Sequence, residues 1–570
     1  MSDSNYWRRL SSDPVSRRTV LRGAAVGSTA VVAAALIGCG STPATPATPA
    51  TGGGGASAAA GTGATAAQPK TGGRLAILLS NDPSTFDMHT QTSINTNYPG
   101  CPVYNQLVQL DPAIGNEKPD GIKPDLAEKW EIAPDGMTYT FSLVKNAKFH
   151  DGTPFTSEDA KASLERNQNP PKGVTAVRKL QFAAVKSFET PDPATLVIKL
   201  SRPVSRLSFL PILGQGFMSI YSKKDIDANF DFKGKMNGTG PFRLKEFLKG
   251  NRVAYDKNKD YFVKDRPYMD GMDIFIIPDD STALANAQSG ALDINNRANA
   301  ANLEKMKQVM GEKGTYQSVG AYKINGFSMN GRQAPWSDDR VRLAITLVVD
   351  RSAALKVLEQ GDGELGGLLP PAGQWALPAK DLAEVQGYQP YSDANLAEAK
   401  KLIAAAGVPN RFKVPLLTRD EAAYRSNSIF MAEQLAKLGW EAKPDIVTAG
   451  ENSQRESKGE FGLEASSNTI SLDDPDAVIA ERFLTTSPGN LTGIGSKAID
   501  DAYNAQSAEQ DQAKRLEMVR SLQKMILAQH GQIVYYWYRR HAIINRRVKN
   551  YTLHTSNLNN NRYQDVWLDA

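Results

Sequence analysis

The chain of 570 residues is 41% hydrophobic and 22% charged, a composition typical of a folded protein with more than one core. Its 66 lysines and arginines exceed its 61 aspartates and glutamates by five, and five arginines precede residue 39. The remaining body is therefore nearly neutral, which argues against a basic surface for DNA or RNA. The two cysteines and five histidines form no HExxH or Cys-x-x-Cys pattern, so we predict neither a metal site nor a cofactor.

The amino-terminal segment indicates export. Residues 16–22, SRRTVLR, precede a short apolar run rich in glycine and alanine. This arrangement resembles a twin-arginine signal with Arg17 and Arg18 as the pair, and the sequence LIGC that follows matches the processing box of a bacterial lipoprotein. The match implies that Cys39 becomes the first residue of the mature protein and carries the lipid. The alternative is a signal anchor that stays in place.

The next segment, residues 40–71, is rich in Pro, Thr, Gly and Ala and has almost nothing to bury. Burial therefore cannot offset the entropy lost on ordering, and we expect a disordered tether. We assign residues 1–38 to the signal peptide and residues 39–72 to the lipidated cysteine and its tether.

From Gly73 onward the chain alternates between strand and helix patterns. Short apolar or alternating runs predict strands at 74–80, 138–149, 195–200 and 273–278. Longer runs with apolar residues at helical spacing predict helices at 338–358, 394–407 and 512–531. The mixture predicts an α/β protein with more than one lobe.

The stretch FHDGTPFTSEDAKASLER, residues 149–166, allows two interpretations. His150 and Asp151 could form the corner of a catalytic site. Alternatively, the strand ends at a turn and a helix begins, with Thr156 as N-cap and Asp159 completing a capping box. The second interpretation accounts for nearly every residue of the stretch, so we predict a structural role for it.

No enzyme motif is present in the sequence. We find no GxSxG, no phosphate-binding glycine loop, no GxGxxG and no zinc-ligand spacing. Paired carboxylates such as Asp473 and Asp474 occur, but the side chains of adjacent residues generally point apart, whereas acid–base pairs must face each other. We therefore predict that the protein is not an enzyme.

Four blocks of the sequence resemble the extracellular solute-binding proteins of family 5, the oligopeptide- and dipeptide-binding group that serves bacterial ABC importers. They are GIKPDLAEKW…SEDAKASLER (121–166), NGTGPFRLKEFLKGNRVAYDKNKDYF (237–262), APWSDDRVRLAITLVVDRSAAL (334–355) and SLDDPDAVIAERFL (471–484). The blocks follow the order and spacing of that family across most of residues 73–570.

The resemblance implies a two-lobed α/β fold of the periplasmic-binding-protein type II kind, with an additional α+β subdomain, the three-domain arrangement called cluster C. It implies lobe I at 73–110, 221–315 and 541–570, the inserted subdomain at 111–220, and lobe II at 316–540. It also implies a monomer that closes on a ligand held between its lobes and then docks on the membrane permease of an importer, which works with ATPase subunits.

The same resemblance suggests where the ligand binds. In peptide-binding relatives, an Asp three residues before the acidic residue of an Asp-Pro pair receives the α-ammonium group. Ser471 occupies that position here, and Asp473 lies close to it. The preceding loop, with Ser467, Asn468 and Thr469, is neutral and rich in hydroxyl and amide groups. Such a loop suits a polyhydroxy ligand, or a peptide that is held differently.

Further candidates for ligand contact come from three other segments. Thr92, Ser93 and Ile94 follow the first predicted strand and are expected to line the cleft by the same alignment. Aromatic walls are expected from Trp375 and from the run 535–538, in particular Tyr535 and Trp537. The alternative interpretation of that run is a buried strand near the hinge.

These observations predict a substrate-binding protein of an ABC importer, exported and held by lipid at the outer face of the cytoplasmic membrane. Its solute is predicted to be a peptide. An oligosaccharide or another small polar solute is the alternative, with a metal complex a further one. Two other functions remain open, a surface lipoprotein that binds a partner without transport, and a hydrolase.

Overall fold

The computed structural model describes residues 68–91, 93–118, 121–172, 174, 176, 178–559 and 561–569. The chain separates into two units, Met1–Ala66 and Ala67–Ala570, and the fold given below is that of the second unit. The predictions for Arg17, Arg18, Cys39 and Thr92 concern residues outside the described part.

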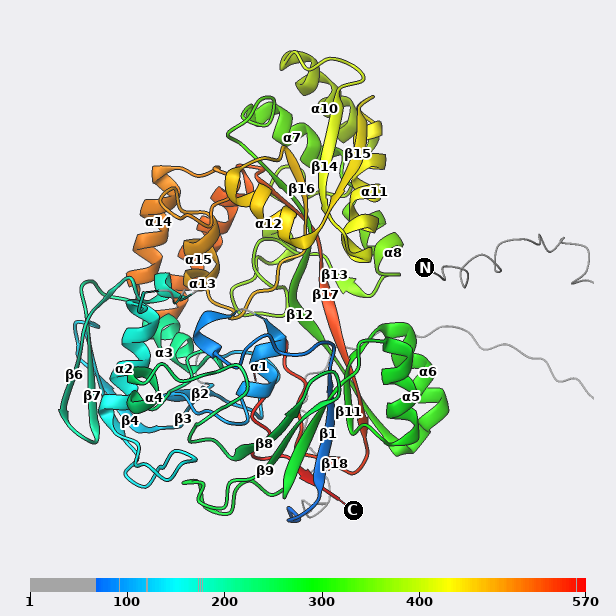
Figure 1. The fold of residues 1–570 in the computed structure, drawn as a ribbon. Coiled ribbons are helices and arrows are strands. Elements are labelled where there is room, and N and C mark those ends of the chain that lie inside the picture. The colour runs from blue at the N-terminus through cyan, green and yellow to red at the C-terminus, as the bar shows by residue number, and fades with distance from the viewer. Residues whose placement is uncertain are drawn as a thin grey trace, which may run out of the picture. The chain divides into compact units, whose positions relative to one another are not determined.

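One large mixed sheet organises the described part of the chain (Figure 1). Its strand order is β15-β14-β16-β12-β17-β11-β1-β10-β9-β8, and β13 pairs with β17. The strands are β1 (Arg74–Leu79), β8 (Phe242–Leu248), β9 (Arg252–Lys257), β10 (Gly271–Ile276), β11 (Ile294–Ala298), β12 (Gly314–Met329), β13 (Gly363–Glu364), β14 (Lys413–Arg419), β15 (Glu441–Val447), β16 (Leu463–Ser466) and β17 (Gln532–Asn545).

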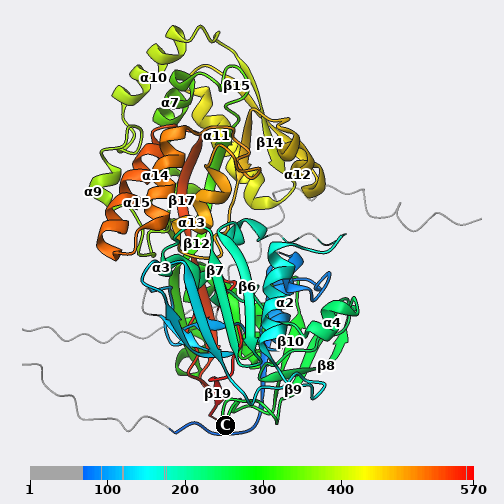
Figure 2. The ribbon, with the colours of Figure 1, turned by 90° about the vertical axis from the view of Figure 1, so that its left-hand side faces the viewer.

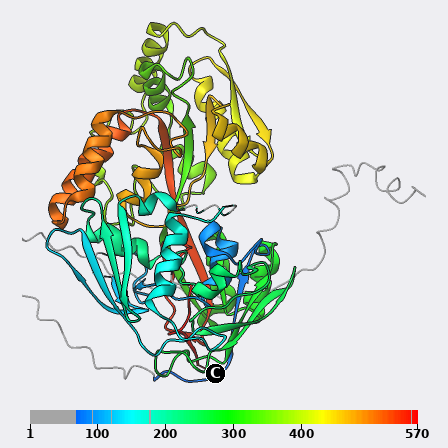
Figure 3. The ribbon, with the colours of Figure 1, turned by 60° about the vertical axis from the view of Figure 1, so that its left-hand side comes forward.

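Two long antiparallel strands, β12 and β17, connect the two halves of this sheet. They have 16 and 14 residues, and their register shifts between Gly320 and Ile324. At one end β17 pairs with β11, and at the other end β12 pairs with β16. Figure 3 shows β17 in red as it passes from one half to the other. We call the half built on β1 and β8–β11 the first lobe, and the half built on β14–β16 the second lobe.

The first lobe surrounds β1, whose sequence RLAILL is apolar on both faces because both faces are covered. β1 lies between β10 and β11 and runs parallel to both. Helices α5 and α6 pack beside β11 and β17. The helices of this lobe are α1 (Ile94–Gly100), α4 (Lys223–Asp227), α5 (Asp280–Ser289) and α6 (Ala300–Met310), with short 3-10 turns η1 (Met88–Thr90) and η3 (Gly311–Lys313). The C-terminal hairpin is β18 (Val548–Lys549) with β19 (Trp567–Leu568).

A separate four-stranded sheet with the order β4-β5-β7-β6 lies beside the first lobe (Figure 2). In β5, Tyr139, Phe141 and Leu143 are buried and the residues between them are only half-buried, as the alternation predicts. The elements are β2 (Val108–Leu110), β3 (Ile122–Pro124), β4 (Ala127–Ile132), β5 (Thr138–Leu143), α2 (Ser157–Gln168), η2 (Lys179–Phe182), β6 (Val185–Asp192), β7 (Thr195–Leu200) and α3 (Arg206–Gly214). Within the range 111–220 expected from the sequence, residues 121–214 contain this sheet and its helices, and we call them the subdomain; β2 lies just before them.

The start of α2 confirms the structural interpretation of the 149–166 stretch. The Thr156 amide donates to the Asp159 carboxylate at 2.8 Å, and the reciprocal bond of the capping box is also present. His150 Nε2 lies 3.0 Å from the Gly240 carbonyl, and burial lowers the pKa of His150 to about 4. Asp151 accepts hydrogen bonds from the amide and hydroxyl of Thr153. These residues therefore close a turn.

The second lobe has helices on both sides of β14, β16 and β12. They are α7 (Asp339–Val348), α8 (Arg351–Leu358), α9 (Ala379–Leu382), α10 (Asp393–Ala405), α11 (Ala422–Ala436), α12 (Ala449–Lys458), α13 (Pro475–Arg482), α14 (Lys497–Ala508) and α15 (Gln512–Leu527). The single helix predicted for 338–358 is wrong. The chain divides at Val349, where the backbone is extended, because the Asp350 side chain caps a new helix by accepting from the Ala353 amide.

Candidate functional site

A cavity of about 470 Å³ lies where the subdomain, the first lobe and the second lobe meet. We call it the main cavity. Its lining comprises Ile94 of α1, the 178–184 and 202–212 segments of the subdomain, residues 467–471, α13 and two residues of α14 (Tyr503 and Ser507) from the second lobe, and Asn557 and Leu558 near the C-terminus. A solute in this cavity would contact all three parts of the fold. Cavities of this size are typical of small-molecule sites.

The 467–471 loop reaches the cavity because it continues β16 alongside β12. β16 ends at Ser466, and the loop then follows β12, with the Ile324 amide donating to the Asn468 carbonyl at 2.9 Å. The Ile470 amide donates to the Tyr322 carbonyl at 2.7 Å. These backbone bonds hold Ile470 in the core and leave polar side chains of the loop at the cavity surface.

The structure brings together five of the residues that the sequence predicted for ligand contact. These residues line the main cavity: Ile94, Ser467, Asn468, Thr469 and Ser471. The Ser471 carbonyl accepts from Asn559 Nδ2 at 3.1 Å and from Ser556 Oγ at 3.4 Å. The C-terminal segment thus holds the backbone of the loop in place at Ser471.

Two predicted contact residues, Ser93 and Asp473, do not line the main cavity and form hydrogen bonds within the protein. Ser93 is the N-cap of α1 and accepts from the Asn95 amide at 3.1 Å. Asp473 is only 2% exposed, and its carboxylate accepts from the Gln374 amide at 2.7 Å. Burial raises the pKa of Asp473 to about 7.

The three predicted aromatic contact residues, Trp375, Tyr535 and Trp537, lie in the hydrophobic core with at most 1% exposure. The Trp375 ring stacks on the Arg515 guanidinium at 4.6 Å. Trp537 donates from its indole nitrogen to the Gly367 carbonyl at 3.1 Å. The burial of residues 533–537 agrees with the alternative interpretation of that run as a buried strand, because its side chains belong to two hydrophobic clusters of the second lobe.

Beside the main cavity is a second one of about 340 Å³, which we call the side cavity. Four residues line both cavities: Ser467, Asn468, Glu481 and Arg482. The side cavity is bordered further by polar groups of β14, α12 and β16, among them Glu456 and Glu464. Burial, followed by the hydrogen bond with Glu456 and the charge of that residue, raises the pKa of Glu464.

Sequence reasoning missed the charged residues of these cavities. Arg178 and Arg202 come from the subdomain, and Glu481 and Arg482 from the end of α13. α13 is well specified by its sequence, because Asp474 is its N-cap and Pro475 occupies its first turn. The quoted block 471–484 contained Glu481 and Arg482, but nothing in the sequence indicated that they face a cavity that the subdomain also lines.

A buried ion pair holds α13 in place. Asp474 and Arg515 are 1% and 0% exposed in their side chains, and Arg515 Nη1 lies 3.0 Å from Asp474 Oδ2. Ser208 of α3 donates to Asp474 at 2.7 Å. This network therefore joins the subdomain to the second lobe beneath the main cavity.

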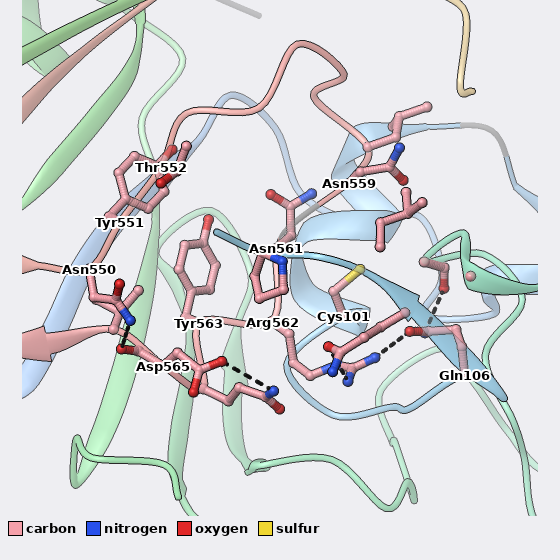
Figure 4. A pocket seen from close by; sticks show the side chains of 18 residues that line it. Cys101, Gln106, Asn550, Tyr551, Thr552, Asn559, Asn561, Arg562, Tyr563 and Asp565 are labelled. Carbon is pink, nitrogen blue, oxygen red and sulfur yellow. Dashed lines mark hydrogen bonds between the residues drawn. The ribbon is translucent and has the colours of Figure 1, made fainter. Parts of the chain in front are cut away.

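Figure 4 shows a smaller pocket of about 50 Å³ in the first lobe. Arg562 donates to Gln106, and it pairs with Asp125 at 2.8 Å. Burial raises the pKa of the Cys101 thiol to about 12, so the thiol stays protonated. The pocket is far smaller than the main cavity, and its lining contains no residue of the second lobe. We therefore take the main cavity as the candidate site.

Within the described residues, no group of three or more His, Cys, Asp and Glu side chains is arranged to hold a metal ion. The helices of the described part are all too short or too polar to cross a bilayer.

Two α/β lobes that share a sheet through two long strands, with a cavity lined from both, define a two-lobed ligand-binding protein. The model of the bacterial extracellular solute-binding proteins, family 5, matches residues 121–490, and the chain belongs to this family. It is therefore a substrate-binding protein of the ABC transporter type and not an enzyme, as predicted from its sequence.

Known proteins of the same type are similar over most of the chain. The dipeptide-binding protein of Escherichia coli (strain K12) is 29% identical over 492 residues, which cover 81% of this chain and 88% of that protein. Heme-binding protein A of Haemophilus influenzae is 27% identical over 455 residues, covering 74% and 79%.

Solved structures confirm the predicted fold class. The periplasmic binding protein DppA of Helicobacter pylori, in complex with the peptide STSA, superposes with a TM-score of 0.75 at 24% identity and covers 88% of this chain and 99% of its own. AgaA of A. tumefaciens R10, in complex with agropinic acid, gives 0.72 at 25% identity, with 87% and 99% covered.

Proposed function

We propose that this protein captures a small polar solute, in the first place a peptide, in the main cavity and delivers it to the permease of an ABC importer. The observation that carries the proposal is the lining of this cavity, to which both lobes and the subdomain contribute. A solute that contacts several parts at once binds best when they are close together, so its binding favours the closed state. The peptide-binding names of relatives support the choice of solute.

The lining indicates how such a solute would be held. Ser471 offers a hydroxyl where a carboxylate would receive an α-ammonium group, so the cavity must bind that group elsewhere. Glu481 is an exposed carboxylate of the lining without an ion pair among the described residues, and we propose it for this role. The Oδ1 atom of Asn557 is buried without a protein hydrogen-bond partner, so a ligand N–H or O–H group would satisfy it.

The second candidate is an oligosaccharide or another small polar solute. It is favoured by the Ser467–Asn468–Thr469 sequence, because hydroxyl and amide groups pair readily with sugar hydroxyls. The bound agropinic acid of AgaA shows that a relative of the same fold accepts a ligand that is not a peptide.

Thermal unfolding of the full-length chain with ligand pools separates the candidates. Pools of di- to pentapeptides and pools of oligosaccharides are added at about 1 mM, and hits are titrated by calorimetry. A ligand at 100 times its dissociation constant stabilises the native state by about 2.7 kcal/mol, a shift that melting curves detect. Stabilisation by sugars alone would replace the peptide by the second candidate, and the absence of any shift from either pool would contradict both.

We further propose that Cys39 anchors the protein at the outer face of the cytoplasmic membrane after export through the Arg17–Arg18 signal, and that the protein is monomeric. The proposed division remains lobe I at 73–110, 221–315 and 541–570, subdomain at 111–220, and lobe II at 316–540. The four-stranded sheet and most of its apolar core lie within 111–220, which supports that boundary.

A further inference from the structure

Arg482, at the end of α13, lines both the main and the side cavity. Within the described residues, its guanidinium makes neither a hydrogen bond nor an ion pair. Burial lowers the pKa of Arg482, and the charges of Glu481 and Glu456 oppose that shift. An arginine carries five N–H donors, and those of Arg482 border the two cavities, where a ligand or water can accept hydrogen bonds from them.

Arg178 contributes a second guanidinium to the main cavity from the subdomain. It is 6% exposed, stacks on the Phe217 ring at 3.7 Å, and donates from Nη1 to the Gln91 carbonyl at 2.9 Å. No carboxylate of the described residues lies within 4 Å of it. Burial lowers the pKa of Arg178 to about 9, so the side chain still carries its charge at neutral pH. The stacking fixes the plane of the guanidinium before any ligand arrives.

The charges of the main cavity do not balance. Its lining contains three arginines, Arg178, Arg202 and Arg482, and two carboxylates, Asp476 and Glu481. The Asp476 carboxylate already has protein partners, because it accepts hydrogen bonds from Gln506 at 2.5 Å and Ser507 at 2.8 Å and lies 3.5 Å from the buried Arg515. Arg202 donates to Pro203 and Ser507 and, among the described residues, has no carboxylate partner. Three cations therefore face one free carboxylate.

We propose that the solute carries a carboxylate, or a comparable anionic group, that binds between Arg482 of the second lobe and Arg178 of the subdomain. This inference rests on the proposed function and specifies its ligand class. η2, which begins after Arg178, packs against α13, which ends at Arg482, so the two cations belong to neighbouring elements on different parts of the fold. An anion between them offsets their repulsion and forms charge-assisted hydrogen bonds to both. Among peptides, the expected ligand has an acidic side chain in addition to its own terminal carboxylate.

The test compares peptides that differ only in charge. Tripeptides of alanine with Glu, Gln or Lys at each position in turn are titrated into the full-length chain by calorimetry, in a buffer free of carboxylates and phosphate. A matched pair of non-peptide ligands, an aldonic acid and the corresponding neutral sugar, is titrated in the same way. The variants are Arg482→Gln, which removes the charge, and Arg482→Lys, which keeps it. Arg411→Gln is the control, since it removes the same charge from a side chain that is 86% exposed and outside both cavities.

We expect at least one Glu peptide to bind about tenfold tighter than its Gln counterpart, because a hydrogen bond to a charged group contributes more than a neutral one. The preference should fall to about threefold or less in Arg482→Gln and persist in Arg411→Gln. If only the aldonic acid binds, and binds better than its sugar, the anionic ligand class holds and the peptide proposal fails. Unchanged affinity of Arg482→Gln for every anionic compound that binds the wild type, or no binding of any anionic compound, overturns the inference.

Discussion

The buried Asp474–Arg515 pair allows a quantitative test of what holds the cavity wall together. Replacing Asp474 by alanine leaves the Arg515 guanidinium, with 0% exposure, without its 3.0 Å partner. Breaking a buried ion pair from one side costs about 3–5 kcal/mol. We expect the lower end of that range, about 3 kcal/mol, because Asp476 remains 3.5 Å from Arg515 as a partial counter-charge. Loss of the N-cap adds about 1 kcal/mol.

The expected total of about 4 kcal/mol corresponds to a measurable change in melting temperature. With an unfolding entropy of about 2.1 cal/mol/K per residue, roughly 500 residues that unfold together lose about 4 °C for 4 kcal/mol. Asp474→Asn separates charge from capping, since asparagine is an equally good N-cap but neutral. It should keep about three quarters of the effect. Differential scanning calorimetry of wild type and both variants provides the measurement.

The control is an exposed ion pair of similar geometry. Lys497 and Asp501 lie 2.7 Å apart with side chains that are 86% and 62% exposed. Lys497→Ala should change stability by less than about 0.5 kcal/mol, because water screens such a pair. A loss of under 1 kcal/mol in Asp474→Ala would refute the argument that this network bears on stability. A full effect in Asp474→Ala with none in Asp474→Asn would assign the loss to the helix cap alone.

Three further predictions concern other parts of the chain. Burial raises the pKa of Glu117 from 4.5 to about 8, so the native state binds the proton of Glu117 more tightly than the unfolded state does. The stability of the wild type should therefore fall between about pH 5 and pH 8 more steeply than that of Glu117→Gln. Melting curves across this pH range provide the measurement, and parallel pH dependences of the two proteins would contradict the prediction. Gly326→Ala would place a Cβ 1.9 Å from the Ile533 carbonyl oxygen between β12 and β17, and should cost about 1–3 kcal/mol in thermal melts, whereas Gly234→Ala, with open space around it, should have little effect. Cys39→Ser should move the protein from the membrane to the soluble fraction on cell fractionation, and continued membrane association would argue against a lipid anchor.

Local features of the fold were predictable because a few neighbouring residues determine them. The alternation in β5 and the capping box of α2 depend on contacts within one strand or one helical turn. The break between α7 and α8 was missed for the opposite reason. The apolar pattern runs through Val349, and only the capping bond of Asp350 ends the first helix and starts the second.

The candidate site was predictable only where it follows the chain. Its 467–471 loop was located by the resemblance of the following block to the Asp-Pro loop of family 5, and the structure brings four of its predicted side chains to one cavity. Arg178 contributes to the same cavity from nearly 300 positions earlier in the sequence, and no local pattern encodes that proximity. The aromatic run in β17 shows the same limit. Whether Tyr535 and Trp537 face a ligand or the core depends on the elements that cover the strand, which the sequence of the strand does not specify.

The contacts around the cavity suggest which groups a ligand can act on. The Ser471–Asp473 segment is already bonded on its far side, since the Asp473 amide donates to Glu117 at 2.6 Å and Asn559 donates to the Ser471 carbonyl. Such bonds need no solute, so they contribute little to any difference between empty and loaded states. A ligand shifts a conformational equilibrium only by its differential affinity for the two states. Arg178 and Arg482 lie on different parts of the fold and have no ionic partner in the part of the chain that the structure describes, so an anion that joins them would bind the closed state better. We therefore expect Arg482→Gln to lose both the preference for anionic solutes and the closure of the lobes on ligand binding. Small-angle scattering with and without ligand would detect the loss of closure.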